Sequence, residues 1–217
     1  MRIKWLGHAS FMITSDTGIK IITDPYEPAF VAAGGPSYGA IKEAADIVTV
    51  SHEHTDHNNV AAIRGNPKVV RGTAKVKGIE FKGVPTYHDE AGGKQRGNNT
   101  ILCFEVDGIR VCHLGDLGHR LSDSQVAELG RIDVLLIPVG GFYTIGAKVA
   151  TDICNQLKPR VIIPMHYKTD KCGFPITGVD EFLRGKEGVS RLNASEVEFK
   201  PGELPDSTQI IVLKSAL

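Results

Sequence analysis

A strand-like apolar run leads directly into a cluster of metal-ligand residues in the segment Ile47-Val48-Thr49-Val50-Ser51-His52-Glu53-His54-Thr55-Asp56-His57. Imidazole and carboxylate groups are the usual nitrogen and oxygen ligands of zinc and related cations. Three histidines and an aspartate within six residues are too many donors in one short loop for a single ion. The segment therefore predicts two metal ions side by side at the end of a buried strand.

The size and charge of the chain restrict the classes of partner. Its 217 residues suit a single domain spanning residues 1–217, and a hydrophobic fraction of 41% suits a globular fold. Acidic and basic residues balance to a formal net charge of zero, which gives no electrostatic footprint for nucleic acid or an anionic membrane. Apolar runs such as Val134–Ile137 are far shorter than the ~20 residues that cross a bilayer. We expect a small-molecule substrate, no nucleic acid and no membrane, and leave a homo-oligomer open.

The cysteines and the N-terminal residues bear on the compartment. The first residues, Met1–Trp5, enter a strand-like pattern without the features of a signal peptide. The four cysteines, Cys103, Cys112, Cys154 and Cys172, have no close Cys-x-x-Cys spacing. We therefore expect free thiols and a cytoplasmic location.

Short strands separated by turn residues dominate the first half of the chain. Strands are expected at Arg2–Leu6, Ser10–Thr14, Ile19–Thr23, Ile47–Val50, Lys68–Val70, Gly78–Pro85, Thr100–Val106 and Ile109–His113. Asp107-Gly108 is a two-residue hairpin signal between the last two strands. A short helix is expected at Asn59–Arg64, ended by Gly65-Asn66-Pro67.

Helices alternate with buried strands in the second half. Helices are expected at Ser122–Leu129, Ala147–Leu157 and Gly178–Arg184, and strands at Asp133–Pro138, Arg160–Ile163, Glu196–Lys200 and Gln209–Leu213. A meander followed by strand–helix alternation favours an α/β fold with two sheets packed face to face and helices outside. Two loops, Pro25–Tyr38 and Asp89–Gly97, are candidates for mobility.

Further ligand-type residues follow other predicted strands. His88 comes after the strand through Val84, Asp116 after the strand Ile109–His113, and His166 after the buried strand near Ile163. Open sheets collect ligands at the carboxyl ends of their strands. We therefore expect these three side chains to converge on the His52–His57 cluster.

The combined pattern resembles the metallo-β-lactamase superfamily. Its carriers are the His-x-His-x-Asp-His motif at 52–57 with His88, Asp116 and His166, and the segments Trp5-Leu6-Gly7-His8-Ala9-Ser10, Thr23-Asp24-Pro25, Arg96-Gly97-Asn98-Asn99-Thr100, His113-Leu114-Gly115-Asp116 and Ile137-Pro138-Val139-Gly140-Gly141. The finer pattern looks like the branch of ascorbate-6-phosphate lactonase-like proteins and of the phosphodiesterase that releases N-acylethanolamines from phospholipid. The resemblance implies a four-layer αββα sandwich of two mixed β-sheets flanked by helices.

The resemblance also implies a division of the ligands between two ions. His52, His54 and His88 would hold the first metal, Asp56, His57 and His166 the second, and Asp116 would bridge both. Zinc is the expected metal, with manganese or iron as alternatives. The resulting prediction is a dinuclear metal-dependent hydrolase.

The ligand count predicts the chemistry. Three protein ligands and a bridging carboxylate leave an open position on each ion, which marks a catalytic site. A hydroxide shared by the two ions would be the nucleophile, and Asp56 could orient it as well as bind metal. The sequence has no Gly-x-Ser-x-Gly elbow that would offer a serine nucleophile. The expected substrate is a small ester-like molecule: a lactone, a phosphodiester or an acyl ester.

Five other residues are candidates for roles around the metals. Asp24 is predicted to accept the far N–H of a metal-bound imidazole. His8 and Tyr143 are candidates for the pocket wall, and His113 for a structural contact beside Asp116. His119, in the loop after Gly118, is a candidate proton donor to the leaving group.

Three alternatives stay open at this point. An iron-dependent oxidoreductase on the same scaffold would show stoichiometric iron and oxygen consumption. A nuclease of the same superfamily would need the basic stripe that this sequence lacks. A non-catalytic metal-binding module would carry the ligands without turnover.

Overall fold

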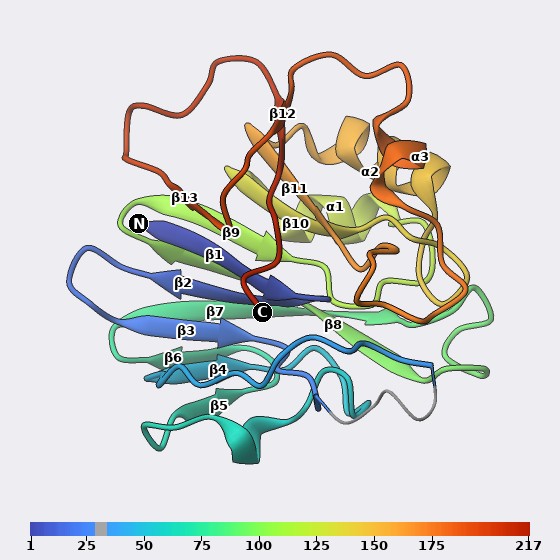
Figure 1. The fold of residues 1–217 in the computed structure, drawn as a ribbon. Coiled ribbons are helices and arrows are strands. Elements are labelled where there is room, and N and C mark those ends of the chain that lie inside the picture. The colour runs from blue at the N-terminus through green and yellow to red at the C-terminus, as the bar shows by residue number, and fades with distance from the viewer. Residues whose placement is uncertain (29–33) are drawn as a thin grey trace.

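Two mixed β-sheets packed face to face form the framework of the molecule (Figure 1). The computed structural model describes residues 1–28 and 34–217. The smaller sheet has the strand order β13 (Glu196–Glu198), β1 (Arg2–Gly7), β2 (Ser10–Thr14), β3 (Lys20–Thr23), β4 (Ile47–Thr49) and β5 (Lys68–Val70). The larger sheet has the order β12 (Val189–Arg191), β14 (Gln209–Val212), β11 (Val161–Met165), β10 (Val134–Pro138), β9 (Ile109–His113), β8 (Asn98–Val106), β7 (Ile79–Tyr87) and β6 (Ala74–Val76).

Three α-helices pack against the larger sheet beside β10 and β11 (Figure 1). They are α1 (Asp123–Leu129), α2 (Ala147–Leu157) and α3 (Val179–Leu183). Ser122 caps α1 through a reciprocal pair of hydrogen bonds with Gln125, as its residue type predicts. The helices bury apolar side chains such as Ile153 and Phe182 against the sheet.

The smaller sheet is apolar on both faces. Neighbouring residues of a strand point in opposite directions, and consecutive residues of its strands are apolar. Ile21 and Ile47 belong to the large core between the sheets, whereas the next residues, Ile22 and Val48, belong to a separate cluster on the outer face. That outer cluster is covered by Tyr26, Tyr38 and Ile41 from the segment between β3 and β4. Among the described residues, the only helical element that packs on this outer cluster is the 3₁₀ turn Val60–Ala62.

Parallel pairing brings several strand ends to one edge of the molecule. β3 pairs with β4 in parallel, and β9, β10 and β11 are parallel to one another. Four of these strands, β3, β4, β9 and β11, end within three residues of a residue of the candidate site: Asp24, His52, Asp116 and His166. The segment after β4 is tied to the larger sheet, because the backbone N–H of Thr100 donates to the carbonyl of Ser51 at 2.9 Å.

The predicted fold class is confirmed, with differences in detail. The helix expected at Asn59–Arg64 is a single 3₁₀ turn, which follows from its lack of a capping side chain. Strands β6 and β12 were not expected from the sequence; each has three residues and lies at an edge of the larger sheet. The hairpin at Asp107-Gly108 is confirmed, since both residues have positive φ, as a two-residue turn requires.

Two of the cysteines differ from expectation. Cys103 and Cys112 lie directly opposite each other on the paired strands β8 and β9 and form a disulfide. The expectation of four free thiols is therefore wrong for this pair, because cross-strand pairing brings together residues that sequence spacing alone does not connect. Cys154 and Cys172 are free and buried.

Two further expectations concern loops and the membrane. Within the loop Pro25–Tyr38, residues 29–33 lie outside the described residues. The loop Asp89–Gly97 is described throughout. In the part of the chain that the structure describes, no helix is long and apolar enough to span a bilayer.

Candidate metal centre

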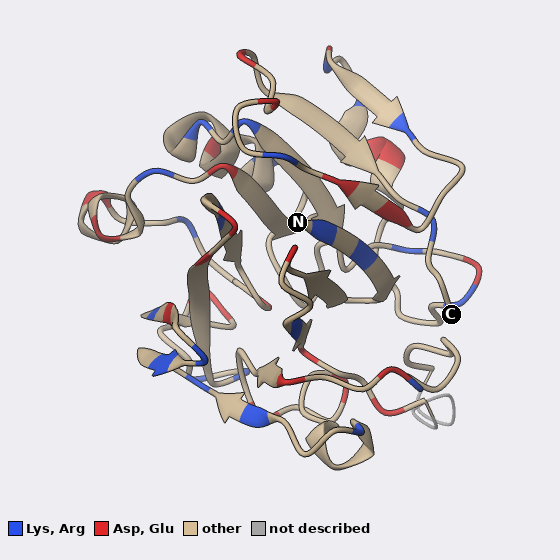
Figure 2. Ribbon diagram, turned by 90° about the vertical axis from the view of Figure 1, so that its left-hand side faces the viewer, with Lys and Arg blue, Asp and Glu red and all other residues tan. Residues whose placement is uncertain are grey.

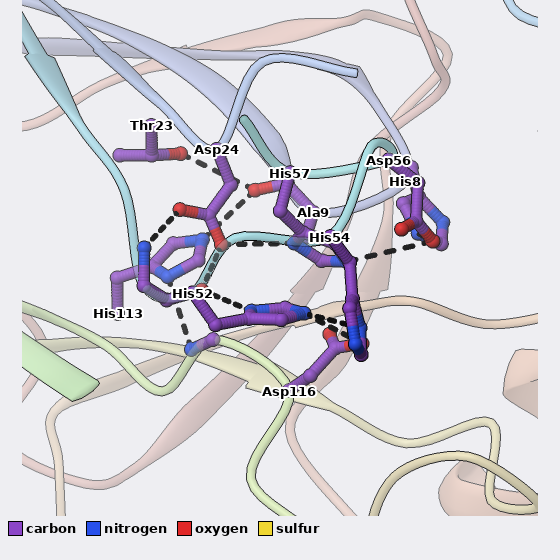
Figure 3. A network of polar contacts seen from close by, with 12 residues as sticks. His8, Ala9, Thr23, Asp24, His52, His54, Asp56, His57, His113 and Asp116 are labelled. Carbon is purple, nitrogen blue, oxygen red and sulfur yellow. Dashed lines mark hydrogen bonds and ion pairs between the residues drawn. The ribbon is translucent and has the colours of Figure 1, made fainter. Parts of the chain in front are cut away.

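Seven predicted ligands come together at the shared edge of the two sheets. Figure 3 labels five of them: His52, His54, Asp56, His57 and Asp116. The loop after β4 supplies four of them: His52, His54, Asp56 and His57. The other three follow β7, β9 and β11, and they are His88, Asp116 and His166. The structure thus brings together every residue for which the sequence predicted a metal-binding role.

The first predicted set is one compact group. The donor atoms of His52, His54 and His88 all lie within 4.8 Å of one another, and His52 Nε2 is 3.1 Å from His54 Nδ1. His52 and His88 are buried, whereas His54 is exposed. Three imidazoles at this spacing match the ligand chemistry of a zinc-type ion.

The second predicted set forms a group that includes a fourth residue. Asp56, His57 and His166 lie with His8, again with donor atoms within 4.8 Å of one another. His8 Nε2 is 3.2 Å from Asp56 Oδ2, and the His8 ring lies 4.2 Å from that of His166 between centroids. The sequence placed His8 in the pocket wall, and the structure places it among the candidate donors.

Asp116 lies between the two groups. Its Oδ2 atom is 3.1 Å from His88 Nε2 on one side, and 3.2 Å and 3.3 Å from the Nε2 atoms of His57 and His166 on the other. This carboxylate faces both sets of donors, which is the position that the bridging role requires.

The buried polar atoms of the cluster fit a bound cation. Asp116 Oδ1 is buried and has no hydrogen-bond partner among the described residues, and buried His57 Nε2 makes no hydrogen bond there either, although Asp116 Oδ2 lies 3.2 Å from it. Buried groups of this kind are rarely left unsatisfied in native structures. A donor set of imidazoles and carboxylates, with unsatisfied atoms within it, fits two divalent ions.

Hydrogen bonds on the far side of two rings select the tautomer that directs Nε2 to the centre. Asp24 Oδ2 accepts the Nδ1–H of His57 at 2.9 Å, and it also accepts the hydroxyl of Ser51 at 2.5 Å. The hydroxyl oxygen of Ser51 accepts in turn from Nδ1 of His52 at 2.9 Å. Both imidazoles therefore present Nε2 to the centre. The contact predicted for Asp24 is present, and the part played by Ser51 was missed.

The carboxylates stay ionised despite their burial. Burial raises the pKa of Asp116, but the opposing effect of His166 and His57 is larger, so the pKa lies well below its usual range. Burial likewise raises the pKa of Asp24, and His113 and His57 bring it below its ordinary value. Burial also raises the pKa of Asp56, and His57 and His8 bring it below its ordinary value. Ionised carboxylates are the form that binds metal.

Burial holds four histidines of the chain neutral by lowering their pKa: His8, His52, His54 and His113. Burial lowers the pKa of His52 to about 3 and, together with the nearby His166, that of His8 to about 4. His57 differs: burial opposes its charge, but the carboxylates of Asp116 and Asp56 raise its pKa well above the usual range. A divalent ion bound at His57 would have to displace that proton.

Two more side chains fix the turn that carries Asp116. His113 donates from Nε2 to the carbonyl of Ala9 at 2.8 Å and accepts the N–H of Gly115 at Nδ1. Asn99, on β8, accepts the backbone N–H of Asp116 at 2.9 Å. His113 thus makes structural contacts beside Asp116. Asn99 was missed, although it lies in a segment that carries the family resemblance.

The backbone at three strand ends lies in the left-handed region. His8, Asp24 and His166 have φ values of +53°, +38° and +50°. Such conformations cost about 1–3 kcal/mol for residues other than glycine and cluster at functional sites. They turn the chain sharply, which places His8 and His166 at the centre and Asp24 behind the His57 ring.

His119 is not among the residues that line the cavity beside the candidate ligands. Its Nε2 accepts the backbone N–H of Tyr87 at 3.1 Å, and its Nδ1 donates to the carbonyl of Arg120 at 2.6 Å. Both ring nitrogens are therefore engaged with backbone. This placement does not fit the proton-donor role predicted for His119.

A cavity of about 440 Å³ exposes the centre to substrate. His54, Asp56, His88, Asp116 and His166 form part of its lining, and Arg96, Tyr143 and Phe174 complete its wall. The pocket position predicted for Tyr143 agrees with this geometry. A larger hollow of about 830 Å³ lies along β6 to β9 and includes none of the candidate metal ligands. We assign the chemistry to the smaller cavity because the ligands converge there.

The fold and this donor set define a metal-dependent hydrolase of the metallo-β-lactamase type. The sequence profile of the β-lactamase superfamily domain matches residues 2–166. The chain is 31% identical to a UPF0173 metal-dependent hydrolase of Archaeoglobus fulgidus, over 94% of this chain and 97% of the relative. A relative of the same description from Thermococcus onnurineus is 30% identical over 94% of this chain and 98% of its own length.

A solved structure agrees with this assignment. A chain from Thermotoga maritima, described as a Zn-dependent hydrolase of the metallo-β-lactamase superfamily, has a TM-score of 0.80 and 40% identity, covering 98% of this chain and 97% of its own. The present chain therefore belongs to the metallo-β-lactamase superfamily, among its metal-dependent hydrolases.

Proposed function

We propose that the protein uses two divalent metal ions, zinc in the first instance, to hydrolyse a small ester-like substrate: a lactone, a phosphodiester or an acyl ester. The observation that carries the proposal is the position of Asp116, whose Oδ2 lies within 3.3 Å of His88 Nε2 on one side and of His57 and His166 on the other. When bound, the two ions would supply a water of lowered pKa and Lewis-acid polarisation of the ester oxygen.

The residues of the chain divide the remaining tasks. Asp56 reaches the cavity, is ionised, and can accept a hydrogen bond from an attacking water. His8 contacts the Oδ2 atom of Asp56 and thereby fixes its orientation. Asp24 holds His57 directly, and it holds His52 through Ser51. These contacts position the reacting groups before substrate arrives.

A small substrate is favoured over a nucleic acid. The cavity volume of about 440 Å³ lies in the range of small-molecule sites. Figure 2 shows Lys and Arg interspersed with Asp and Glu along the ribbon, and the net charge is zero. A nucleic-acid site requires a concentration of positive charge along one face.

The direct test is hydrolysis by metal-reconstituted protein, screened over lactones, phosphodiesters, acyl esters and thioesters. We expect zinc-dependent turnover of at least one class, lost in His54→Ala and Asp56→Ala. Glu53→Gln is the matched control, because Glu53 lies between two ligands yet is exposed and pairs with Arg71 at 2.7 Å. Stoichiometric iron with oxygen consumption, and hydrolysis of none of these substrates, would instead establish the oxidoreductase alternative.

A further inference from the structure

Arg96 places an unneutralised positive charge at the wall of the cavity. Its half-buried side chain lines the cavity together with His54 and Asp56. Within residues 1–28 and 34–217, no carboxylate forms an ion pair with this guanidinium, and no acceptor takes a hydrogen bond from its side chain. A guanidinium has five N–H donors in a planar fork that matches a carboxylate or phosphate.

The nearest acidic residues in sequence are already engaged or face outward. The carboxylate of Asp89 accepts the backbone N–H groups of Ala91, Gly93, Gln95 and Arg96 at 2.7–3.0 Å. Glu90 is exposed. The charge of Arg96 is thus available to a ligand in the cavity.

The loop that carries Arg96 is fixed in place. The four hydrogen bonds to buried Asp89 close the loop 89–97 around one carboxylate. The N–H of Gly97 donates to the carbonyl of Gly93, and the N–H of His88 donates to the carbonyl of Gly97, both at 3.0 Å. Arg96 is therefore held at a defined distance from His88, at the other end of the same loop.

Aromatic rings connect Arg96 to the candidate metal ligands. The Arg96 guanidinium lies 5.7 Å from the centre of the Tyr143 ring. The Tyr143 ring meets Phe174 edge to face at 5.1 Å, and Phe174 stacks on His166 at 6.5 Å. The wall thus runs from a cation, across two aromatic rings, to the centre.

We propose that Arg96 forms an anion-binding subsite, and that the substrate carries a carboxylate or phosphate group separate from the bond that is cut. An apolar or planar segment of the substrate packs on Tyr143 and Phe174, between that anionic group and the reacting atoms. Two divalent ions facing two carboxylates would leave a formal charge of about +2 at the centre, which also attracts an anion. The inference rests on the proposed hydrolytic function and adds the substrate class.

The kinetic test compares two esters of equal length on the zinc-loaded protein. The nitrophenyl monoester of glutarate is anionic, and nitrophenyl pentanoate is neutral. We expect Arg96→Gln to raise KM for the glutarate ester about tenfold or more and to leave KM for the pentanoate ester within about twofold. Arg96→Lys should fall between wild type and Arg96→Gln. Lys94→Gln, an exposed residue of the same loop, should match the wild type.

A binding measurement separates failure of the subsite from failure of the proposed function. Calorimetry on zinc-loaded protein would compare phenylbutyrate and phenylpropyl phosphate with neutral phenylbutyramide. Weaker binding of either anion to Arg96→Gln supports the subsite even if no ester is hydrolysed, in which case only the proposed function fails. If ester hydrolysis is present but Arg96→Gln binds both anions and turns over both esters like wild type, the subsite is refuted and the hydrolytic function stands.

Discussion

Asp24 and His57 form a buried pair in which the Nδ1–H of the imidazole donates to Oδ2 of the carboxylate at 2.9 Å. Nε2 of the same ring lies 3.2 Å from Asp116 Oδ2. The pair therefore fixes which nitrogen of His57 faces the centre. Carboxylates in this position also raise the basicity of an imidazole ligand.

Replacing Asp24 should weaken metal binding without removing a ligand. Asp24→Asn is expected to lower zinc affinity about 10- to 100-fold, because it removes the charge behind His57 and disturbs the Ser51 link to His52. Competition with a chromogenic chelator measures the change. Thr49→Val serves as the control, since Thr49 is buried near Asp24 and its hydroxyl has no partner among the described residues. Equal affinities in the two variants would contradict the assignment of Asp24.

Two bound ions require two separable sets of ligands. His88→Ala and His166→Ala should each retain one zinc per chain where the wild type holds two, because each variant removes a ligand of a different group. Elemental analysis of the purified proteins measures the ratio. His119→Gln should keep both ions and full activity, since its ring is hydrogen-bonded to backbone at Tyr87 and Arg120. Two ions in either alanine variant would exclude the division proposed here.

The candidate ligands could be predicted because each follows a recognisable strand. The His52–His57 motif is local, and His88, Asp116 and His166 come after apolar runs whose parallel ends share an edge. The contributions of Asn99 and Ser51 were not predictable from spacing. Asn99 lies 17 residues from Asp116 in the chain and meets it only because β8 pairs with β9.

The parts of the fold that were missed carry weak sequence signals. Strands β6 and β12 are three residues long and partly exposed, so they show no clear alternation of apolar and polar residues. The role predicted for His119 followed from its closeness to Asp116 in sequence. In the structure, the intervening turn directs its ring toward the backbone of Tyr87 instead. Backbone geometry, rather than residue type, decided that outcome.

The metal-free protein should lose stability as pH falls from about 6.5 to 4. Burial lowers the pKa of His8 to about 4, whereas an unfolded histidine titrates near 6.5. Below pH 6.5 the unfolded chain therefore binds a proton that the folded chain does not, and the stability conferred by neutral His8 is lost. The shift corresponds to about 3 kcal/mol. Urea unfolding in the presence of a chelator at pH 6.5 and pH 4.5 measures it.

The raised pKa of His57 changes stability with pH in the opposite direction to His8. The dependence of unfolding free energy on pH should show both effects. Its pKa is raised in the folded protein, so its contribution is fully present below pH 6.5 and declines as pH rises through the folded value. We expect a stability maximum near pH 6.5 for the metal-free protein. His8→Gln should flatten the acid side of the curve only. An unchanged acid slope in that variant would rule out His8 as the group responsible.

Gly118 is required by a close backbone approach. A Cβ atom at this position would lie 2.2 Å from the carbonyl carbon of His88 and 2.3 Å from the backbone nitrogen of Asp89. Gly118→Ala should therefore displace His88, destabilise the protein by about 2 kcal/mol or more, and reduce metal content. Gly72→Ala is the matched control, because an added Cβ there meets no atom within 4 Å. Denaturant unfolding and elemental analysis would compare the stability and metal content of the two variants. Equal stability and equal metal content would show that the backbone at Gly118 and His88 shifts to accommodate the Cβ atom without cost.

Asp89 should determine the order of the loop that presents Arg96. Burial raises the pKa of Asp89, but hydrogen bonds from the backbone N–H groups of Arg96, Gln95, Ala91 and Gly93 bring it below its usual value, so the carboxylate is ionised at neutral pH. Asp89→Ala leaves these amides without their acceptor. Their hydrogen exchange, measured by mass spectrometry on the zinc-loaded protein, should then accelerate roughly tenfold or more.

The same variant separates loop order from the metal centre. Asp89→Ala should raise KM for the anionic glutarate ester while zinc content stays at the wild-type level, because Asp89 contacts the backbone of the loop rather than the candidate ligands. Glu90→Ala, at an exposed neighbouring position, should change neither exchange nor KM. Unaltered exchange at residues 91–96 in Asp89→Ala would mean that other contacts hold the loop. Faster exchange with an unchanged KM would mean that Arg96 reaches its position without the loop being held.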